Sequence, residues 1–366
     1  MSSQRVLIFG AGAIGRGFLG PLLTQHGIEI SFVDVNQTLI EQLKDRNSYK
    51  VAITNNSDYE IVDVPISSSF LLGEKCDVEN FDIVFLCVGP KNCYELADIL
   101  KTAKTVISCE NDMSTVVGLK DLTGNPNIYF GIPDVITSNT ASAELLERDP
   151  LMTVTERGVL VTEKGNYSLP AGILQLENHE VEMHWMCKFF IHNAPHAIVA
   201  YLGWLKSYTY IHDAMADKQI EDVVIGAINE ICEGIIKSKL VSKQMTLTYR
   251  DKEIRRFRNK LLYDLIFRVA REPLRKLSKD NRLILSTRIC MFNGILPKYT
   301  ATGIKAALHY GEEKDDEAIY LQNIRLSMSD NEILKEYSGI EILDPLNDYI
   351  AKIDISSFKK RENILC

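Results

Sequence analysis

One lysine, one asparagine and two histidines lie close together in an otherwise apolar stretch, residues 188–203. In an α-helix successive residues are about 100° apart, so Lys188, His192 and His196 fall on one stripe at intervals of roughly 40°. Asn193 lies about 140° from Lys188, at the edge of the same face. An apolar segment seldom buries such side chains unless they have partners. We therefore expect the stripe to line a cleft; the alternative is a core helix with an incidental histidine.

Pro195 lies inside this stretch and has no amide hydrogen to donate. A helix that runs through residues 188–203 must therefore kink at Pro195 or restart with it in the first turn. In either case we expect Asn193 to be freed from a regular turn, with its amide pointing into a pocket.

A glycine turn lies near the start of the chain between two predicted strands. The apolar run of residues 5–9 leads into Gly10-x-Gly12-x-x-Gly15, helix-like sequence follows, and a second apolar run of residues 28–33 ends at Asp34. This order of strand, glycine turn, helix, strand and acid is typical of a dinucleotide-binding fold. The alternative, a structural turn that binds no nucleotide, would not require the acid.

Each part of this pattern has a physical role. Gly10 permits a tight turn, Gly12 lets the backbone approach a pyrophosphate, and Gly15 lets helix and strand pack closely. Asp34 would bind the ribose diol and repel a 2′-phosphate. No arginine neighbours Asp34 in Asp34-Val-Asn36, so we expect NAD rather than NADP. The predicted cofactor-binding residues are Gly10, Ala11, Gly12, Ala13, Ile14, Gly15, Asp34, Val88, Gly89 and Pro90.

Three further apolar runs have the character of buried parallel strands, at residues 81–88, 105–109 and 128–134. Ligands of doubly wound sheets bind beyond the carboxyl ends of the strands, so the residues that end these runs should lie at one edge. They are Gly89-Pro90, Asn111 and Asp134.

The rest of the chain changes character at about residue 188. Residues 151–155 and 159–162 alternate like antiparallel strands that extend or cover the parallel sheet. Helical patterns follow at residues 221–237, 250–276, 283–307 and 317–335. We therefore predict an α/β fold, with a Rossmann-like doubly wound sheet and antiparallel extension in residues 1–187 and a mainly helical substrate or catalytic domain in residues 188–366.

The composition argues against several classes of protein. The formal charge of −8 argues against a general nucleic-acid binder. The eight cysteines form no CxxC pair and are best explained as reduced thiols in the cytosol. No apolar run approaches the roughly 20 residues that a membrane span needs, and a strand starts too early to leave room for a signal peptide. We expect a cytoplasmic protein with no membrane partner.

The sequence resembles the long-chain polyol-specific dehydrogenases over nearly its whole length. The resemblance rests on the glycine turn, on Lys188-x4-Asn193-x2-His196, and on further matches at residues 88–90, 109–111, 200–203, 271–283 and 303–307. It implies NAD-linked oxidation of a polyol without a metal. Lys188 would be the general base, Asn111 and Asn193 would donate hydrogen bonds to the reacting oxygen, and His196 would orient a neighbouring hydroxyl.

The resemblance also concerns the substrate. Asp134 falls where the family has an acid near the substrate, although Val135 replaces the arginine that usually follows. The chain's length and C-terminal half resemble the phosphate-specific branch. The implied reaction is reversible oxidation of mannitol 1-phosphate to fructose 6-phosphate by a monomer; the alternative is an unphosphorylated polyol or a hexonate. Candidate substrate-binding residues are Asp134, Arg271, Arg275 and Lys305.

The expected chemistry agrees with these residues. Alcohol oxidation at neutral pH needs a base whose pKa lies well below the roughly 10.4 of a free lysine, and burial of Lys188 would lower it. Two amides aimed at the developing oxyanion would supply about 3–4 kcal/mol per donor.

Two other functions fit parts of the sequence. A zinc-dependent alcohol dehydrogenase could use His192 and His196, spaced four apart, with His179, His184 and Cys187 nearby. No HExxH motif accompanies them, and a catalytic lysine beside zinc would be redundant. An NAD-sensing protein without turnover would need the glycine turn but would leave the lysine, asparagine and histidine without a purpose.

Overall fold

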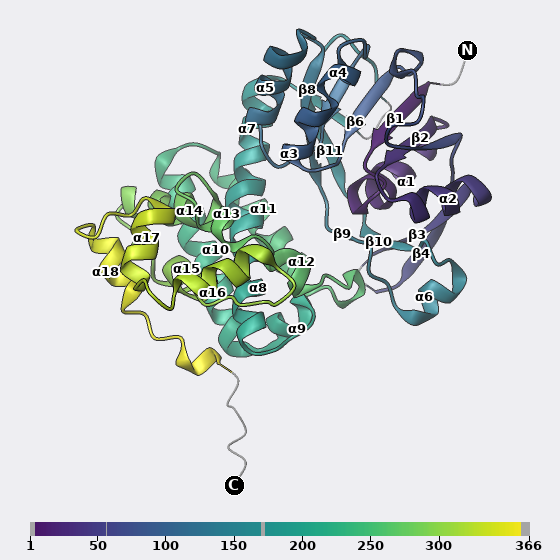
Figure 1. Ribbon diagram of the computed structural model, residues 1–366. Coiled ribbons are helices and arrows are strands. Elements are labelled where there is room, and N and C mark those ends of the chain that lie inside the picture. The colour runs from purple at the N-terminus through teal and green to yellow at the C-terminus, as the bar shows by residue number, and fades with distance from the viewer. Residues whose placement is uncertain (1–3, 56, 170–172, 360–366) are drawn as a thin grey trace. The chain divides into compact units, whose positions relative to one another are not determined.

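The computed structural model describes residues 4–55, 57–169 and 173–359. The chain forms two compact units (Figure 1), which are described separately below. The N-terminal unit is Met1–His184 with Leu261–Tyr263, and the C-terminal unit is Trp185–Lys260 with Asp264–Cys366. The boundary predicted from the sequence lies at residue 187. No described helix is long and apolar enough to cross a membrane.

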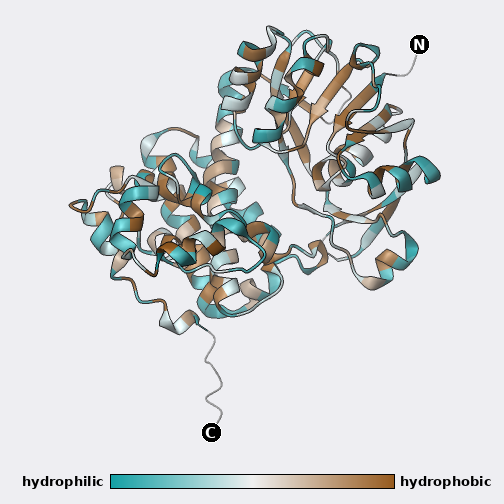
Figure 2. Ribbon diagram, viewed as in Figure 1, coloured by the Kyte–Doolittle hydropathy of each residue, from teal (hydrophilic) through white to brown (hydrophobic). Residues whose placement is uncertain are grey.

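The N-terminal unit contains an eight-stranded sheet in the order β12-β11-β8-β7-β6-β1-β2-β5. All neighbouring strands are parallel except β8 and β11. The central strands β1, β6 and β7 are buried almost throughout, which explains their unbroken apolar sequence (Figure 2). The strands are β1 Arg5–Phe9, β2 Glu29–Asp34, β5 Ser68–Leu71, β6 Ile83–Leu86, β7 Val106–Ser108, β8 Ile128–Asp134, β11 Val159–Glu163 and β12 Ile173–Leu176. The predicted doubly wound sheet with an antiparallel extension is confirmed.

A second sheet in this unit has the order β4-β3-β10-β9. Its strands are β3 Ser48–Thr54, β4 Tyr59–Pro65, β9 Thr137–Ser138 and β10 Thr153–Glu156. The two strands predicted in residues 151–162 are present but belong to different sheets: β10 pairs with β3 and β9, whereas β11 pairs with β8 and β12. Alternation of apolar residues sets the two faces of a strand but does not choose its neighbours.

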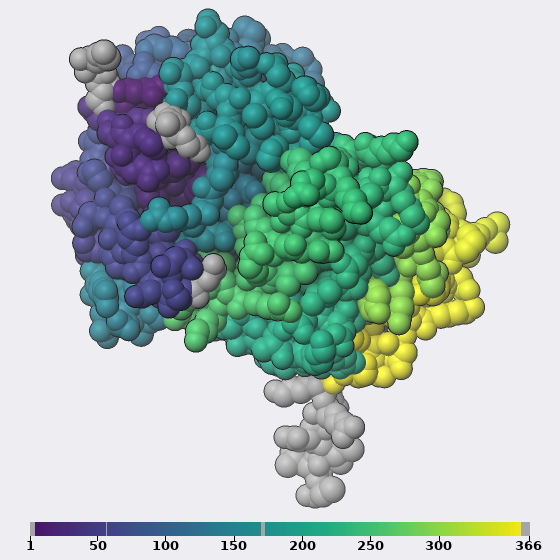
Figure 3. All heavy atoms as spheres, turned by 180° about the vertical axis from the view of Figure 1, so that it is seen from behind, coloured from purple at the N-terminus to yellow at the C-terminus, as the bar shows by residue number. Residues whose placement is uncertain are grey.

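The helices of the N-terminal unit are short. The helix after the glycine turn starts as a π-helix, η1, which packs against β9 and β10. In the surface of this unit seen from behind, purple atoms from the start of the chain adjoin teal ones (Figure 3). The helices are η1 Ala13–Leu19, α1 Gly20–Thr24, α2 Gln37–Arg46, η2 Val78–Asn80, α3 Pro90–Cys93, η3 Tyr94–Leu96, α4 Ala97–Leu100, α5 Ser114–Thr123 and α6 Ala143–Arg148; α7 Asn178–Met186 crosses the boundary between the units.

The C-terminal unit is helical and is built around α8 Ala194–Leu205, in which only Trp204 is not buried. Helices α9, α10, α12, α14 and α15 contact α8. The other helical segments are η4 Cys187–Asn193, α9 Ile211–Ala216, α10 Lys218–Ser238, α11 Lys243–Phe257, α12 Ile266–Ala270, α13 Pro273–Leu277, α14 Arg282–Phe292, α15 Lys298–Leu308, α16 Asp316–Ile324, α17 Asp330–Ser338, α18 Pro345–Ala351 and η6 Ser356–Phe358, with η5 Lys260–Leu262 at the unit boundary.

Three of the predicted helices are divided in the structure. Residues 283–307 form α14 and α15, because Gly294 adopts a left-handed conformation with φ of +70° and Pro297 caps the second helix. Residues 317–335 form α16 and α17, and Ser329 begins the second with a capping box. Residues 250–276 contribute to α11, α12 and α13. The predicted helix at residues 221–237 is confirmed as α10.

Candidate active site

The glycine turn lies at the carboxyl end of β1, whose neighbours in the sheet are β2 and β6. Gly10 has φ of +96°, and a Cβ there would overlap the Cys87 carbonyl oxygen; a Cβ on Gly15 would overlap the carbonyl of Gly10. Packing therefore requires both glycines. Nothing lies within 4 Å of a Cβ placed on Gly12. This glycine faces open space, which is what a bound pyrophosphate would need.

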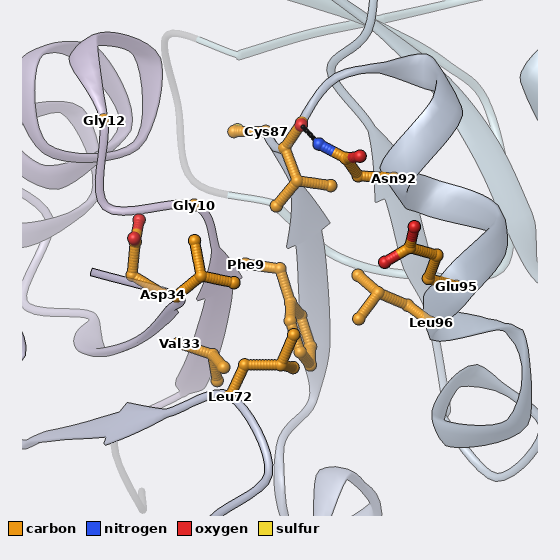
Figure 4. Close-up of a pocket in the computed structure, with 12 residues that line it drawn as sticks. Phe9, Gly10, Gly12, Val33, Asp34, Leu72, Cys87, Asn92, Glu95 and Leu96 are labelled. Carbon is orange, nitrogen blue, oxygen red and sulfur yellow. Dashed lines mark hydrogen bonds between the residues drawn. The ribbon is translucent and has the colours of Figure 1, made fainter. Parts of the chain in front are cut away.

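A pocket of about 400 Å³ opens beside this turn (Figure 4). This volume is within the range of small-molecule sites. Asp34 stands between the pocket and the turn: its Oδ2 accepts from Ala11 N at 2.7 Å, and its Oδ1 accepts from Asn36 N at 2.8 Å. Each carboxylate oxygen keeps a lone pair for a ribose hydroxyl. Apolar side chains supply much of the wall, namely Phe9, Val33, Val35, Leu72, Val88 and Leu96.

Val88 lines this pocket, and Gly89 and Pro90 follow it in the chain. Gly89 has φ of +93°, its amide donates to Glu110 Oε1 at 2.8 Å, and Asn92 Nδ2 donates to Val88 O at 2.7 Å (Figure 4). Glu110 thus shapes the loop that the sequence analysis assigned to the cofactor. Sequence reasoning missed this role, although Glu110 directly follows a predicted strand end.

Arg16 is a second residue that sequence reasoning missed. No arginine neighbours Asp34 along the chain, but Arg16 lines a hollow with Asp34 and Gly12. Its guanidinium is buried: Nε donates to Ala11 O and Nη1 to Leu151 O, both at 2.6 Å. Burial lowers the pKa of Arg16, although Tyr49, Asp34 and Asp149 act in the opposite direction. Arg16 therefore ties the turn to the segment before β10.

The strand ends predicted to meet at one edge do so within the N-terminal unit. β6, β7 and β8 are adjacent and parallel. Asn111 follows β7 and is exposed, and Asp134 ends β8 and is buried. Their contact with a substrate stays a prediction.

In the C-terminal unit, Lys188 and Asn193 lie on the π-helix η4, within helical structure that continues from Asn178 to Leu205. The i→i+5 bonding of a π-helix widens the turn to roughly 4.4 residues, or about 82° per residue. Lys188 and Asn193 are then about 50° apart instead of the roughly 140° expected for an α-helix. After this π turn the chain continues as α8 from Ala194 with Pro195 in the first turn, which agrees with the predicted restart, and the π geometry before it favours one face for both side chains.

The side chains of this motif differ in exposure and in partners. Lys188 is half-buried, whereas Asn193 and His196 are buried. The amide of Asn193 makes no hydrogen bond with any residue that the structure describes. A buried amide in this state is suited to bind an oxygen of a ligand.

His196 is held by Asp264, whose Oδ2 lies 2.6 Å from Nε2. Burial alone would raise the pKa of Asp264, but Arg268 and His196 outweigh it and hold the pKa well below its usual range. The ionised carboxylate must accept, so Nε2 donates, and the tautomer that carries its proton on Nε2 has Nδ1 as an acceptor. Such an acceptor can orient a hydroxyl.

His192 is held in the same way by Glu253, with 2.6 Å between Nδ1 and Oε2. Burial lowers the pKa of His192 to about 4, so the ring is neutral at pH 7. Arg256 Nη1 donates to the other oxygen of Glu253 at 2.8 Å, and the ring of Phe257 stacks on His196. None of these partners was predicted from the sequence, because no motif marks them within residues 250–276.

The basic residues predicted to bind substrate have different surroundings. Arg271 and Arg275 are exposed near α13, and Arg275 pairs with Glu272 at 2.6 Å. Lys305 is buried, and its Nζ lies 2.6 Å from Asp330 Oδ2 and 2.7 Å from Ala351 O. The ammonium of Lys305 thus holds α15, α17 and α18 together. Substrate binding by these three residues stays a prediction.

A metal centre was the other interpretation of the histidines. Within the described ranges no group of three or more His, Cys, Asp or Glu side chains is arranged to hold a metal ion.

Comparison with known proteins identifies the family. The model of the mannitol dehydrogenase Rossmann domain matches residues 4–125, and that of the mannitol dehydrogenase C-terminal domain matches residues 180–350. The chain belongs to the mannitol dehydrogenase family. The predicted oxidoreductase class, long-chain polyol-specific family and dinucleotide-binding domain of this chain are confirmed.

Its relatives include two mannitol-1-phosphate 5-dehydrogenases. That of Caldanaerobacter subterraneus subsp. tengcongensis is 30% identical over 95% of this chain and 97% of the relative. That of Exiguobacterium sp. is 32% identical over 95% of this chain and 96% of the relative. Among solved structures, Pseudomonas fluorescens mannitol 2-dehydrogenase, in complex with NAD and D-mannitol, has a TM-score of 0.74, with 16% identity, and covers 96% of this chain and 90% of its own. At that identity the likeness concerns the fold.

Proposed function

We propose that this member of the mannitol dehydrogenase family catalyses the reversible, NAD-dependent oxidation of mannitol 1-phosphate to fructose 6-phosphate, without a metal. The observation that carries the proposal is the Lys188–Asn193–His196 set on one π turn and the helix after it, together with the similarity to mannitol-1-phosphate 5-dehydrogenases. NAD⁺, when bound, accepts the hydride from the carbinol carbon. We further expect a cytoplasmic monomer that needs no nucleic acid or membrane.

Residues of the chain carry out proton transfer, stabilise the reacting oxygen and bind the substrate and cofactor. Lys188 takes the proton of the substrate hydroxyl, and Asn111 and Asn193 donate hydrogen bonds to the oxygen as its negative charge grows. His196, held by Asp264, accepts from a neighbouring hydroxyl and orients it. Asp34 and the glycine turn bind the cofactor's adenosine ribose and pyrophosphate. Asp134 contacts the substrate.

The substrate assignment is tested with ketose reduction followed by NADH absorbance. We expect fructose 6-phosphate to react far faster than free fructose, tagaturonate or fructuronate, and NADH to be preferred to NADPH because Asp34 repels a 2′-phosphate. An equal or faster reaction with an unphosphorylated ketose would replace the proposal with the polyol or hexonate alternative. Binding of NADH without oxidation in the presence of any of these ketoses would indicate a sensing protein.

The role of Lys188 is tested with Lys188→Ala. Turnover should fall by orders of magnitude, on the order of 100-fold or more, because the variant lacks the base. NADH affinity, measured by fluorescence titration, should stay nearly unchanged. Lys237→Ala is a suitable control, because Lys237 forms an exposed ion pair with Glu233 on α10. Wild-type turnover in Lys188→Ala would end the proposed role.

A further inference from the structure

Two buried cations of the C-terminal unit have no carboxylate partner. Lys276 in α13 is 4% exposed, and Arg282, the first residue of α14, is 9% exposed. Among the described residues neither side chain forms an ion pair; Arg282 Nε donates to the amide oxygen of Asn281 at 3.1 Å. A buried cation without a counter-ion is strongly unfavourable. The pair is therefore suited to bind an anion.

The surroundings of Lys276 and Arg282 disfavour the charged form of both side chains. Burial, followed by repulsion from Arg282 and Arg275, lowers the pKa of Lys276 well below its ordinary value. Burial and Arg275 lower the pKa of Arg282 to about 10. Arg282 also lies at the positive end of the α14 dipole, where a cation is disfavoured.

The neighbouring carboxylates of Glu272 and Asp315 already have other partners. Glu272 pairs with Arg275 at 2.6 Å. The carboxylate of Asp315 accepts from the backbone amides of Glu272, Glu317 and Ala318. Neither acid forms an ion pair with Lys276 or Arg282 in the described part of the chain.

A buried hydroxyl close to these cations also lacks a partner. Tyr201 on α8 is fully buried, and its Oη makes no hydrogen bond within the described residues. Burial raises the pKa of Tyr201, whereas Arg282 and Arg275 act in the opposite direction, which places both guanidinium groups within electrostatic range. Helix α14 contacts both α8 and α13. Two cations and one hydroxyl donor thus come from three packed helices.

We propose that Lys276, Arg282 and Tyr201 form the binding subsite for the phosphate group of the substrate, an inference that rests on the proposed function. A phosphate dianion balances two cations and offers three acceptor oxygens, whereas the carboxylate of a hexonate balances one.

The first test measures binding of inorganic phosphate to the full-length protein by calorimetry, with NADH saturating so that the glycine turn is occupied. Wild-type protein should bind phosphate, and Arg282→Gln and Lys276→Met should weaken binding roughly 10- to 100-fold. Arg288→Gln is the matched control, because Arg288 lies on the same helix and faces Asp344. No binding by wild-type protein, or wild-type binding by both variants, would overturn the subsite.

Folding of the variants can be judged separately. Because Lys276 is a buried charge without a counter-ion, Lys276→Met should raise the midpoint of thermal unfolding in phosphate-free buffer. Tyr201→Phe removes only a hydroxyl that has no partner, so it should fold as the wild type does and still weaken phosphate binding several-fold. Wild-type phosphate affinity in a well-folded Tyr201→Phe would remove Tyr201 from the subsite.

The second test is kinetic. In Arg282→Gln the KM for fructose 6-phosphate should rise roughly 10- to 100-fold, and the preference for fructose 6-phosphate over fructose should fall by a similar factor. Equal losses with both ketoses would overturn a phosphate-specific role, and a loss confined to fructuronate would assign the subsite to a carboxylate. If phosphate binds as expected but fructose 6-phosphate is not reduced, the proposed function fails and the anion site stands. If fructose 6-phosphate is reduced and the variants bind phosphate as the wild type does, the phosphate subsite is wrong and the proposed function stands.

Discussion

His192 and His196 lie one helical turn apart, with ring centroids 4.9 Å apart, and each is held by its own buried carboxylate. Each carboxylate determines which nitrogen of its histidine ring is already bonded. Arg256 balances the charge of Glu253, so His192 does not have to be charged. His192 is therefore a positioning group in the core, whereas under the proposed function His196 would bind a substrate hydroxyl.

The buried state of His192 predicts a stability change with pH. Its folded pKa of about 4 lies below the ordinary 6.5. Below pH 6.5 the unfolded chain therefore binds a proton that the folded chain does not, and stability is lost as the pH falls toward 4. Between pH 7 and pH 5 this one group should lower the free energy of unfolding by about 2 kcal/mol.

The measurement is urea denaturation of wild type and His192→Gln at pH 7 and pH 5, since glutamine can still donate to Glu253. The variant should lose about 2 kcal/mol less than the wild type between the two pH values. His26→Gln, at an exposed position, is the control. The same pH dependence in wild type and His192→Gln would contradict a buried neutral ring.

At the scale of the element, the π turn of η4 has a cause in the sequence. Pro195 lacks the amide that would close an α-type bond on the Ile191 carbonyl. The next amide is five residues beyond that carbonyl, which is the spacing of a π-helix. A proline just after Asn193 is thus the local reason that Lys188 and Asn193 share a face, although they are spaced badly for an α-helix.

Pro195→Ala tests this account. The new amide would complete an α-type turn, so the midpoint of thermal unfolding should rise while turnover falls, by about 10-fold or more, as Asn193 rotates away from Lys188. The same change at Pro345, in the first turn of α18 where no amide bond is needed, should leave turnover unchanged. Wild-type turnover in a more stable Pro195→Ala would show that the position of Asn193 does not depend on the π turn.

At the scale of the whole molecule, the polar groups with catalytic potential are divided between the units. The N-terminal unit supplies Asp34, Asn111 and Asp134, and the C-terminal unit supplies Lys188, Asn193 and His196. Each unit thus carries some of the residues named in the proposal, and the proposed base is a lysine and not a metal-bound group.

Removal of metal is the corresponding test on the intact protein. Dialysis against a chelator should leave turnover with fructose 6-phosphate unchanged, because a lysine base needs no Lewis acid to polarise the substrate oxygen. The zinc content of the active protein should be far below one equivalent. Loss of turnover that added zinc restores would revive the metal-dependent alternative.

The sequence by itself determined the features that depend on neighbouring residues. The glycine turn with Asp34, the apolar central strands and the spacing of Lys188, Asn193 and His196 each carry their physical reason within a few residues. The fold class and family follow from these.

Only the tertiary structure decided which groups hold that chemistry in place. Glu253 and Asp264 are 61 and 68 residues from the histidines they bind, and Arg282 comes within electrostatic range of Tyr201 only because α14 packs on α8. β10 and β11 enter different sheets although two residues separate them. Periodicity shows which face of an element is buried, but the partner on that face depends on how distant segments pack.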